Sequence, residues 1–137
     1  MTEVPRVFCI DDSPTVHARM SHLIREWARY VGYVSWDGAL KRLLLDKPRV
    51  VLIDLNLQGR QGEEIVQLVL RARRMIGSPA IFIFSSCSTT EIRARVPNPE
   101  IGILPKTFDG TMIALIRDSP SQYCFVCLVA GGGICKF

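Results

Sequence analysis

Short apolar runs alternate along this chain with longer segments in which apolar residues recur every three or four positions. Unbroken apolar runs are typical of strands buried on both faces, and the spaced pattern is typical of helices with one buried face. The expected strands are 6–10, 33–36, 50–53, 80–84 and 101–104. The expected helices are about 14–29, the stretch between Asp37 and Pro48, that between Gly62 and Gly77, a brief segment from Thr89 or Thr90 to Arg95, and about 109–117.

A strand followed by a helix thus occurs five times in succession. Each connection is long enough to hold a crossover helix, so the strands are expected to run parallel. The pattern predicts an α/β fold with a five-stranded parallel sheet and helices on both faces. With 137 residues and no repeat beyond this alternation, the chain is expected to form one domain.

Local signals refine the first part of the chain. Ser13 followed by Pro14 is typical of a helix start, with serine as the N-cap and proline at the first helical position. Cys9 is expected in the core of the first strand, and His17 is expected to be a solvated residue of the first helix. Residues 58–62 are expected to form a polar loop after the third strand.

Polar side chains follow the ends of four expected strands. Asp11 and Asp12 follow the first strand, Asp54 the third, Ser85 the fourth, and Lys106 comes shortly after the fifth. The carboxyl ends of parallel strands meet at one edge of the sheet, where open α/β sheets bind their ligands. Three carboxylates gathered there need a cation to remain ionised together, and a hard divalent ion such as Mg²⁺ suits oxygen ligands.

This set of groups suits the transfer of a phosphoryl group to a carboxylate. An ionised Asp54 is the expected nucleophile, and its product would be an aspartyl phosphate. A metal ion and Lys106 would neutralise charge on the transferred oxygens, and Ser85 would donate a hydrogen bond.

On these residues the chain resembles the receiver domain of two-component response regulators, of the single-domain, chemotaxis-regulator type. The family pattern is an acidic pair after the first strand, a phosphoacceptor Asp after the third, Ser or Thr and a small residue after the fourth, and Lys after the fifth. The residues that match are Asp11-Asp12, Asp54, Ser85-Ser86 and Lys106, and Gly62 matches the family's loop glycine. The resemblance covers about residues 4–118. It implies a flavodoxin-like, doubly wound (βα)5 domain over 1–118, followed by a C-terminal tail over 119–137.

The resemblance also implies roles for individual residues. Asp12 and Asp54 would bind Mg²⁺ directly, Asn56 would offer its backbone carbonyl, and Asp11 would act through water. Ser85 and Lys106 would hold the phosphoryl group on Asp54. The donor would be a histidine kinase or a histidine phosphotransfer protein, and the output would be a changed surface for a downstream protein. The chain would be a phosphoacceptor signalling protein rather than an enzyme acting on a separate substrate.

Four features depart from the family pattern. Thr107 stands where the family usually has proline in a cis peptide, and Ile103 replaces an aromatic residue that swings inward on activation. Gln58 lies near the position of the expected loop proline, and the fourth helix is short and ended by Pro97. These changes leave the expected chemistry in place and concern the switch and the output surface.

Composition narrows the setting. The net charge is +4 without a dense block of Lys and Arg, which does not favour nucleic acid as a direct partner. The chain begins without a signal peptide pattern, and no apolar run has the length of a membrane span. Five scattered cysteines argue against a disulfide framework, so a cytoplasmic location is expected. The tail cysteines Cys124, Cys127 and Cys135 lack an obvious fourth zinc ligand.

Three alternatives stay open. One is a protein-interaction module of receiver fold whose output does not depend on phosphate, which Ile103 and Thr107 favour. Another is a receiver fragment of a longer multidomain regulator. The third is a phosphatase of the haloacid dehalogenase type, but that family has a second Asp two residues after its nucleophile, where this chain has Asn56.

Overall fold

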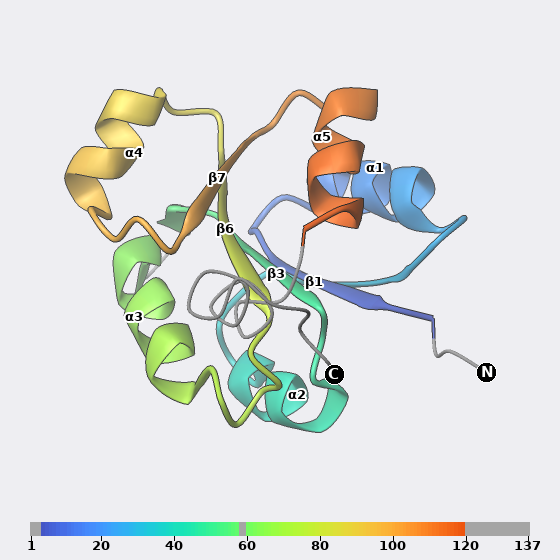
Figure 1. Ribbon diagram of the computed structural model, residues 1–137, viewed down its shortest axis with the longest axis horizontal. Helices are drawn as coiled ribbons and strands as arrows, with labels where there is room; N and C mark the ends of the chain where they lie inside the picture. The colour runs from blue at the N-terminus through green and yellow to red at the C-terminus, as the bar shows by residue number, and fades with distance from the viewer. Residues whose placement is uncertain (1–3, 58–59, 120–137) are drawn as a thin grey trace, which may run out of the picture.

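The computed structural model describes residues 4–57 and 60–119, and in them a five-stranded, all-parallel sheet (Figure 1). The sheet strands are β1 (Arg6–Ile10), β2 (Arg29–Tyr33), β3 (Val50–Ile53), β6 (Ala80–Ser85) and β7 (Gly102–Pro105). Their spatial order is β2-β1-β3-β6-β7. The order reverses between β1 and β3, and a doubly wound sheet has its ligand crevice at the carboxyl ends of the strands at such a point.

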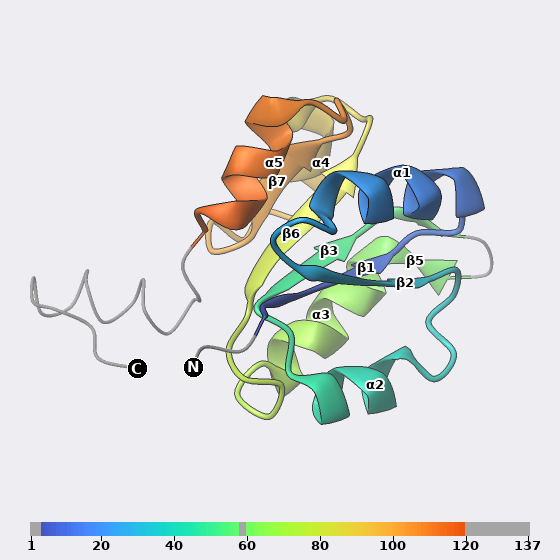
Figure 2. The ribbon, with the colours of Figure 1, turned by 90° about the vertical axis from the view of Figure 1, so that its right-hand side faces the viewer.

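Five helices occur within the described residues, four of them between strands of the sheet and one after its last strand. They are α1 (Pro14–Ile24), α2 (Ala39–Asp46), α3 (Gly62–Ala72), α4 (Thr89–Arg95) and α5 (Gly110–Arg117). Figure 2 shows α1 and α5 on one side of the sheet and α2 and α3 on the other. Buried residues of α4 pack with those of α2 and α3. The expected α/β fold, a parallel sheet with helices on both faces, is therefore confirmed.

The three central strands, β1, β3 and β6, have buried side chains on both faces, as their unbroken apolar runs predict. In β1, Phe8 and Ile10 pack with α2 and α3, whereas Val7 and Cys9 pack with α1 and α5. Cys9 is fully buried, as expected, and burial raises the pKa of its thiol to about 12. The sheet thus lies between two hydrophobic layers, one on each face.

The first helix and the second strand are placed differently from the sequence prediction. α1 ends at Ile24 rather than near residue 29, and β2 spans Arg29–Tyr33 rather than 33–36. The cause is tertiary pairing, because β2 joins β1 in register from Arg6↔Arg29 to Ile10↔Tyr33. Trp27 also fits the helical spacing, but it lies in the turn and packs on the core from there.

Smaller differences concern element ends. β7 spans Gly102–Pro105, one residue later than expected, and α4 is capped by Ser88 rather than by a threonine. In the expected loop 58–62, Arg60–Gln61 forms β5, which pairs antiparallel with β4 (Asn56–Leu57). Gln58 and the tail from residue 120, with its three cysteines, lie outside the described residues.

The expected helix starts at Ser13 and Asp109 are confirmed. The Ser13 hydroxyl accepts a hydrogen bond from the Val16 N–H at 3.3 Å, and Pro14 is the first helical residue. Asp109 Oδ1 accepts from the Met112 N–H at 2.9 Å at the start of α5. Among the described residues, no helix combines the length and the apolar character that crossing a membrane requires.

Candidate functional site

Three carboxylates converge at the carboxyl ends of β1 and β3. The two strands are paired up to Ile10↔Ile53, and the Asp54 N–H continues the pairing by donating to the Ile10 carbonyl at 3.0 Å. Asp11 and Asp54 therefore leave adjacent strands side by side. Carboxylate oxygens of Asp11, Asp12 and Asp54 all lie within 4.8 Å of one another. Asp11 and Asp54 are buried, at 1% and 5% exposed, so little water screens their mutual repulsion.

Lys106 brings a positive charge to this cluster from the end of β7. Its Nζ lies 2.7 Å from Asp11 Oδ2 and 3.5 Å from Asp54 Oδ2. Burial alone would lower the pKa of Lys106, but its bond to Asp11 and the charge of Asp54 outweigh burial and raise it. The lysine is therefore charged in this site and lies nearer to Asp11 than to Asp54.

Asp54 is set apart by its environment. Burial raises its pKa, the Asn56 N–H and Lys106 lower it, and the neighbouring Asp11 and Asp12 raise it again. The net direction is upward. Ionisation of Asp54 is therefore unfavourable beside these carboxylates, and a bound cation would stabilise its ionised form.

Ser85 is buried at the last position of β6, next to Lys106. Its backbone carbonyl accepts from the Lys106 N–H at 3.3 Å, and its hydroxyl accepts from the Cys87 N–H at 3.1 Å. The hydroxyl hydrogen is not used in that second bond and remains able to donate.

Asn56 lies in β4, two residues beyond Asp54. Its N–H donates to Asp54 Oδ1 at 3.2 Å. Its side-chain amide donates to Cys87 Sγ at 3.8 Å and accepts from Arg95 Nη1 at 3.3 Å. The structure thus brings the six residues singled out from the sequence to one edge of the sheet. Their chemical roles stay predictions at this point.

Gly62 has a packing reason to be glycine. It begins α3, and a Cβ atom built on it would lie 2.4 Å from Leu55 Cα and 2.5 Å from the Asp54 carbonyl oxygen. Backbone atoms cannot move aside as a flexible side chain can. A side chain at position 62 would therefore displace the segment that carries Asp54.

The departures from the family pattern have visible local consequences. No cis peptide occurs in the described residues, so the bond before Thr107 is trans. The Thr107 hydroxyl donates to Asp109 Oδ1 at 2.9 Å and thereby joins the cap of α5. Ile103 is half-buried and packs against the core on the side of α2 and α3.

Sequence reasoning missed two residues near the site. His17 was expected in solvent, but it is half-buried, with Nδ1 2.5 Å from the Tyr30 hydroxyl and Nε2 2.7 Å from the Asp11 carbonyl oxygen. Arg95 was predicted only as a helix end, yet it contacts Glu63, Leu55 and Asn56. Neither role has a local sequence signal, because the partners of each residue lie on other elements.

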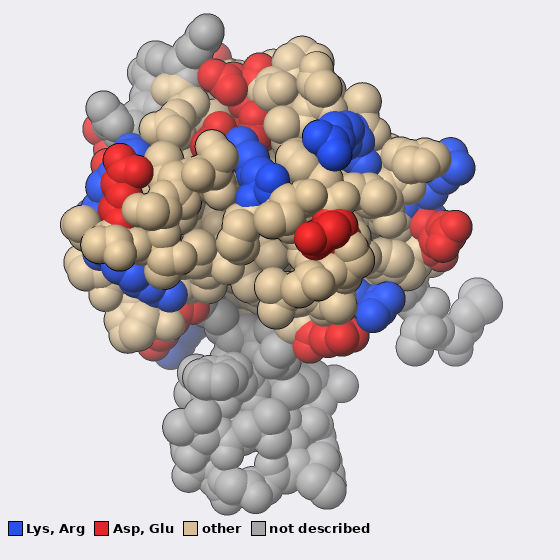
Figure 3. All heavy atoms as spheres, turned by 90° about the horizontal axis from the view of Figure 1, so that it is seen from above, with Lys and Arg blue, Asp and Glu red and all other residues tan. Residues whose placement is uncertain are grey.

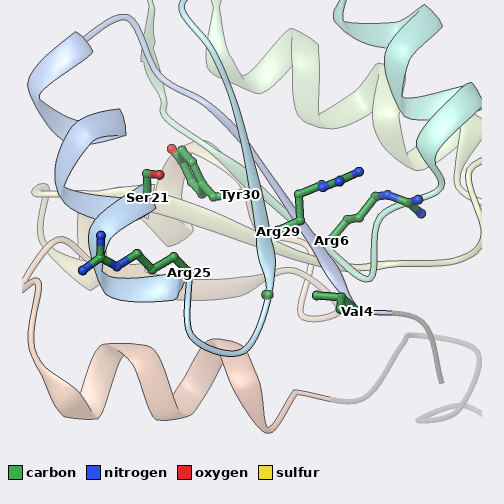
Figure 4. Close-up of a pocket in the computed structure, with 7 residues that line it drawn as sticks. Val4, Arg6, Ser21, Arg25, Arg29 and Tyr30 are labelled. Atoms are coloured by element: carbon green, nitrogen blue, oxygen red, sulfur yellow. The ribbon is translucent and has the colours of Figure 1, made fainter. Parts of the chain in front are cut away.

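A separate cavity of about 490 Å³ lies at the amino ends of β1 and β2. Arg6, Arg25, Arg29 and Tyr30 are among the residues that line it. Figure 4 shows Arg6 and Arg29 side by side on neighbouring strands, with Arg25 pointing away from them. None of the clustered carboxylates lines this cavity, so the candidate chemistry is at the opposite edge of the sheet.

Charge on the surface is mixed where it can be seen. Figure 3 shows acidic and basic side chains interspersed over one face of the molecule rather than gathered into a single basic patch. This agrees with the absence of a dense basic block in the sequence.

Two curated proteins show sequence similarity, although no family model matches the chain. A protein-glutamate methylesterase/protein-glutamine glutaminase of Syntrophus aciditrophicus is 28% identical over 102 residues, which are 72% of this chain and 28% of that protein. A probable methanogenesis regulatory protein, FilR2, of Methanothrix harundinacea is 27% identical over 106 residues, which are 70% of this chain and 68% of that protein. The chain thus spans under a third of the first relative.

Solved structures of receiver domains are similar over most of the chain. The chemotaxis response regulator CheY4 of Vibrio cholerae gives a TM-score of 0.72 at 19% identity, over 84% of this chain and 98% of that chain. A response regulator receiver protein from Pseudomonas putida gives 0.72 at 20% identity, over 87% of this chain and all of that chain. The BeF3-activated DrrB receiver domain gives 0.67 at 15% identity, over 81% and 92%. The described chain therefore has the fold of CheY-like response regulator receiver domains.

Proposed function

We propose that this chain is a response regulator receiver domain that accepts a phosphoryl group on Asp54. The donor is the phosphohistidine of a histidine kinase or a histidine phosphotransfer protein. The phosphorylated domain then presents an altered surface to a downstream protein. The observation that carries the proposal is the convergence of Asp11, Asp12 and Asp54 with Lys106 at the point where the strand order reverses.

The donor set fits Mg²⁺. The cluster offers carboxylate oxygens only, two of its members are buried, and three negative charges face the single positive charge of Lys106. A hard divalent cation prefers such oxygen ligands and offsets the excess negative charge. Asp12, Asp54 and the Asn56 carbonyl would hold the ion, with Asp11 acting through water. When bound, Mg²⁺ would neutralise charge on the transferred oxygens.

Each side chain then has a step to perform. An Asp54 oxygen forms a bond to phosphorus while the bond from phosphorus to the histidine nitrogen breaks. The leaving histidine is protonated on its second ring nitrogen, so it departs as neutral imidazole. Lys106, 3.5 Å from Asp54, is close enough to shift its ammonium toward the incoming oxygens. Ser85 supplies a hydroxyl donor for the same group.

The added phosphate provides the signal. It places a charge of about −1.5 to −2 where a single carboxylate charge stood. In the unphosphorylated structure Lys106 contacts both Asp11 and Asp54. After phosphorylation it would be drawn toward the larger charge on Asp54. Ser85 and the segment after β7 would follow, which changes the surface beside α4 and α5.

Intact-mass spectrometry with acetyl phosphate and Mg²⁺ tests the proposal. The wild type is expected to gain one phosphoryl group, and the gain is expected to vanish with EDTA and in Asp54→Asn. Asp37→Asn is a matched control, because Asp37 is exposed and lies outside the cluster. If the wild type stays unlabelled while a known receiver is labelled, the phosphate-independent interaction module is the better account.

A further inference from the structure

Asn56 is contacted from both ends of helix α4. Cys87, which directly precedes the cap Ser88, lies 3.8 Å from the Asn56 amide nitrogen through its sulfur. Arg95, the last residue of α4, donates to Asn56 Oδ1 at 3.3 Å. The seven-residue helix is therefore tied at its start and at its end to one side chain of the segment after β3.

Arg95 makes the larger part of this connection. Its Nε donates to Glu63 Oε2 at 3.0 Å and its Nη2 to Glu63 Oε1 at 2.6 Å, which is a bidentate pair with α3. The same Nη2 donates to the Leu55 carbonyl at 3.3 Å. The pair is partly sheltered, with the two side chains 24% and 32% exposed. One guanidinium thus holds α3, Leu55 and Asn56 together.

The Arg95 guanidinium does not contact Asp54, but it contacts the residues that directly follow Asp54 in the chain. Leu55 follows Asp54 in the chain, and the Asn56 N–H donates to Asp54 Oδ1 at 3.2 Å. Arg95 therefore holds Leu55 and Asn56, and the placement of these two residues sets where the Asn56 N–H and carbonyl lie relative to Asp54. A change at Arg95 would reach the carboxylate cluster without any contact to it.

We propose that Arg95 is a positioning residue for the phosphoacceptor segment: it holds Leu55 and Asn56 in place for metal binding at Asp54 and links that segment to α4. The proposal rests on the proposed function. By linkage, a partner whose binding shifts α4 would alter metal affinity at Asp54, and metal binding would alter the affinity for that partner by the same factor.

The geometry separates this role from a plain tie between two helices. Arg95→Lys keeps a positive charge that can reach Glu63, but a single ammonium cannot reproduce the planar fork that serves Glu63, Leu55 and Asn56 at once. If Arg95 only ties α4 to α3, lysine should replace it. If Arg95 positions Asn56, lysine should fail almost as badly as alanine.

The measurement is Mg²⁺ binding by calorimetry on the wild type, Arg95→Ala, Arg95→Lys and Arg93→Ala. Arg93 is the matched control, because it lies on the same helix and donates to the Asn98 carbonyl instead. Removing a group that orients metal ligands typically weakens metal affinity about 10–100-fold. We expect at least a tenfold loss in both Arg95 variants and none in Arg93→Ala. Amide exchange in metal-free protein should also be faster at Asn56 in both Arg95 variants.

These measurements distinguish the positioning role of Arg95 from a plain tie between α3 and α4. Wild-type affinity and unchanged Asn56 exchange in Arg95→Lys would overturn the positioning role and leave only the tie between helices. Wild-type affinity in Arg95→Ala would likewise overturn the positioning role, because the tie between α3 and α4 would then have no effect on metal binding. A wild-type protein that binds no Mg²⁺ would contradict the proposed function itself, and with it the part of Arg95 in metal binding.

Discussion

Lys106 lies closer to Asp11 than to the expected phosphoacceptor, with its Nζ 2.7 Å from Asp11 Oδ2. The contact is almost fully shielded from solvent, because the Asp11 side chain is 1% exposed and that of Lys106 is 15% exposed. The positive charge of Lys106 compensates two buried carboxylates that lie side by side. The same lysine thus stabilises the resting site and remains within reach of Asp54.

Removing this lysine should destabilise the metal-free protein. Taking one partner from a buried ion pair typically costs about 3–5 kcal/mol, because the remaining charge is left uncompensated. We expect Lys106→Ala to lower the free energy of unfolding by about that amount in EDTA, measured by urea denaturation. Lys41→Ala, an exposed lysine on α2, is the control and should change little.

Mg²⁺ should reverse part of this loss. A cation in the cluster replaces some of the charge that the lysine supplied, so Mg²⁺ should raise the melting temperature of Lys106→Ala more than that of the wild type. An equal rise in both proteins would mean that the ion and the lysine do not share the same carboxylates.

Asp54 should make stability depend on pH in a defined direction. Its pKa is raised in the folded protein, chiefly by burial, so the folded state binds this proton more tightly than the unfolded chain does. The stability from protonated Asp54 is fully present below its unfolded pKa, near 3.8, and is lost as the pH rises through the folded value. In EDTA at neutral pH, Asp54→Asn should therefore melt above the wild type.

The comparison is thermal unfolding of both proteins in EDTA across the acidic range and up to pH 7. The difference between them should be small at the acid end and should grow as the pH rises. A difference that shrinks with rising pH would contradict the direction assigned to the Asp54 pKa.

Gly62 should tolerate no side chain. The Cβ of alanine would meet backbone atoms of Leu55 and Asp54 at 2.4–2.5 Å, and overpacking of this kind typically costs about 1–3 kcal/mol. Gly62→Ala should lose about that much stability and should also weaken Mg²⁺ binding. Gly110→Ala is the matched control at the start of α5, where nothing lies within 4 Å of the added atom. Equal stability of the two variants would contradict this prediction, because it would show that the backbone at Asp54 and Leu55 can move to accommodate the added Cβ.

The Tyr30 hydroxyl should support the first strand pair through His17. Because His17 Nε2 faces the carbonyl oxygen of Asp11, it carries the ring proton, and Nδ1 accepts from Tyr30. Tyr30→Phe should cost about 1 kcal/mol in urea denaturation, the usual worth of one such bond. Tyr33→Phe is the control and should change stability little. It keeps the stacking on Phe8, and no hydrogen bond to the Tyr33 hydroxyl is found in the described part of the chain. A larger loss in the Tyr33 variant would refute this assignment.

The positions of site residues that directly follow a parallel strand can be predicted from the sequence. Asp11, Asp54 and Lys106 could be placed together because an unbroken apolar run identifies a buried strand, and all such strands end at one edge. Gly62 could be matched by resemblance, but its reason is visible only once the backbone of Leu55 is in place.

What could not be predicted depends on contacts between distant elements. The helical spacing continues to about residue 29 and the expected strand began at residue 33, whereas pairing with β1 places β2 at Arg29–Tyr33. Arg95 has the properties of an ordinary basic helix end until Glu63, 32 residues earlier, is brought beside it. His17 has an unremarkable place on α1, and its partners come from β2 and from the backbone of Asp11.

We propose that Asp54, among three carboxylates within 4.8 Å of one another, carries the phosphoryl group. The most direct measurement treats the protein with acetyl phosphate and Mg²⁺, reduces it with borohydride and sequences its peptides by mass spectrometry. Borohydride converts an aspartyl phosphate to homoserine and leaves a free aspartate unchanged. We expect homoserine at position 54 alone, and we expect it to be lost when Mg²⁺ is withheld. Homoserine at position 11 or 12, or none in protein that has gained phosphate, would contradict it.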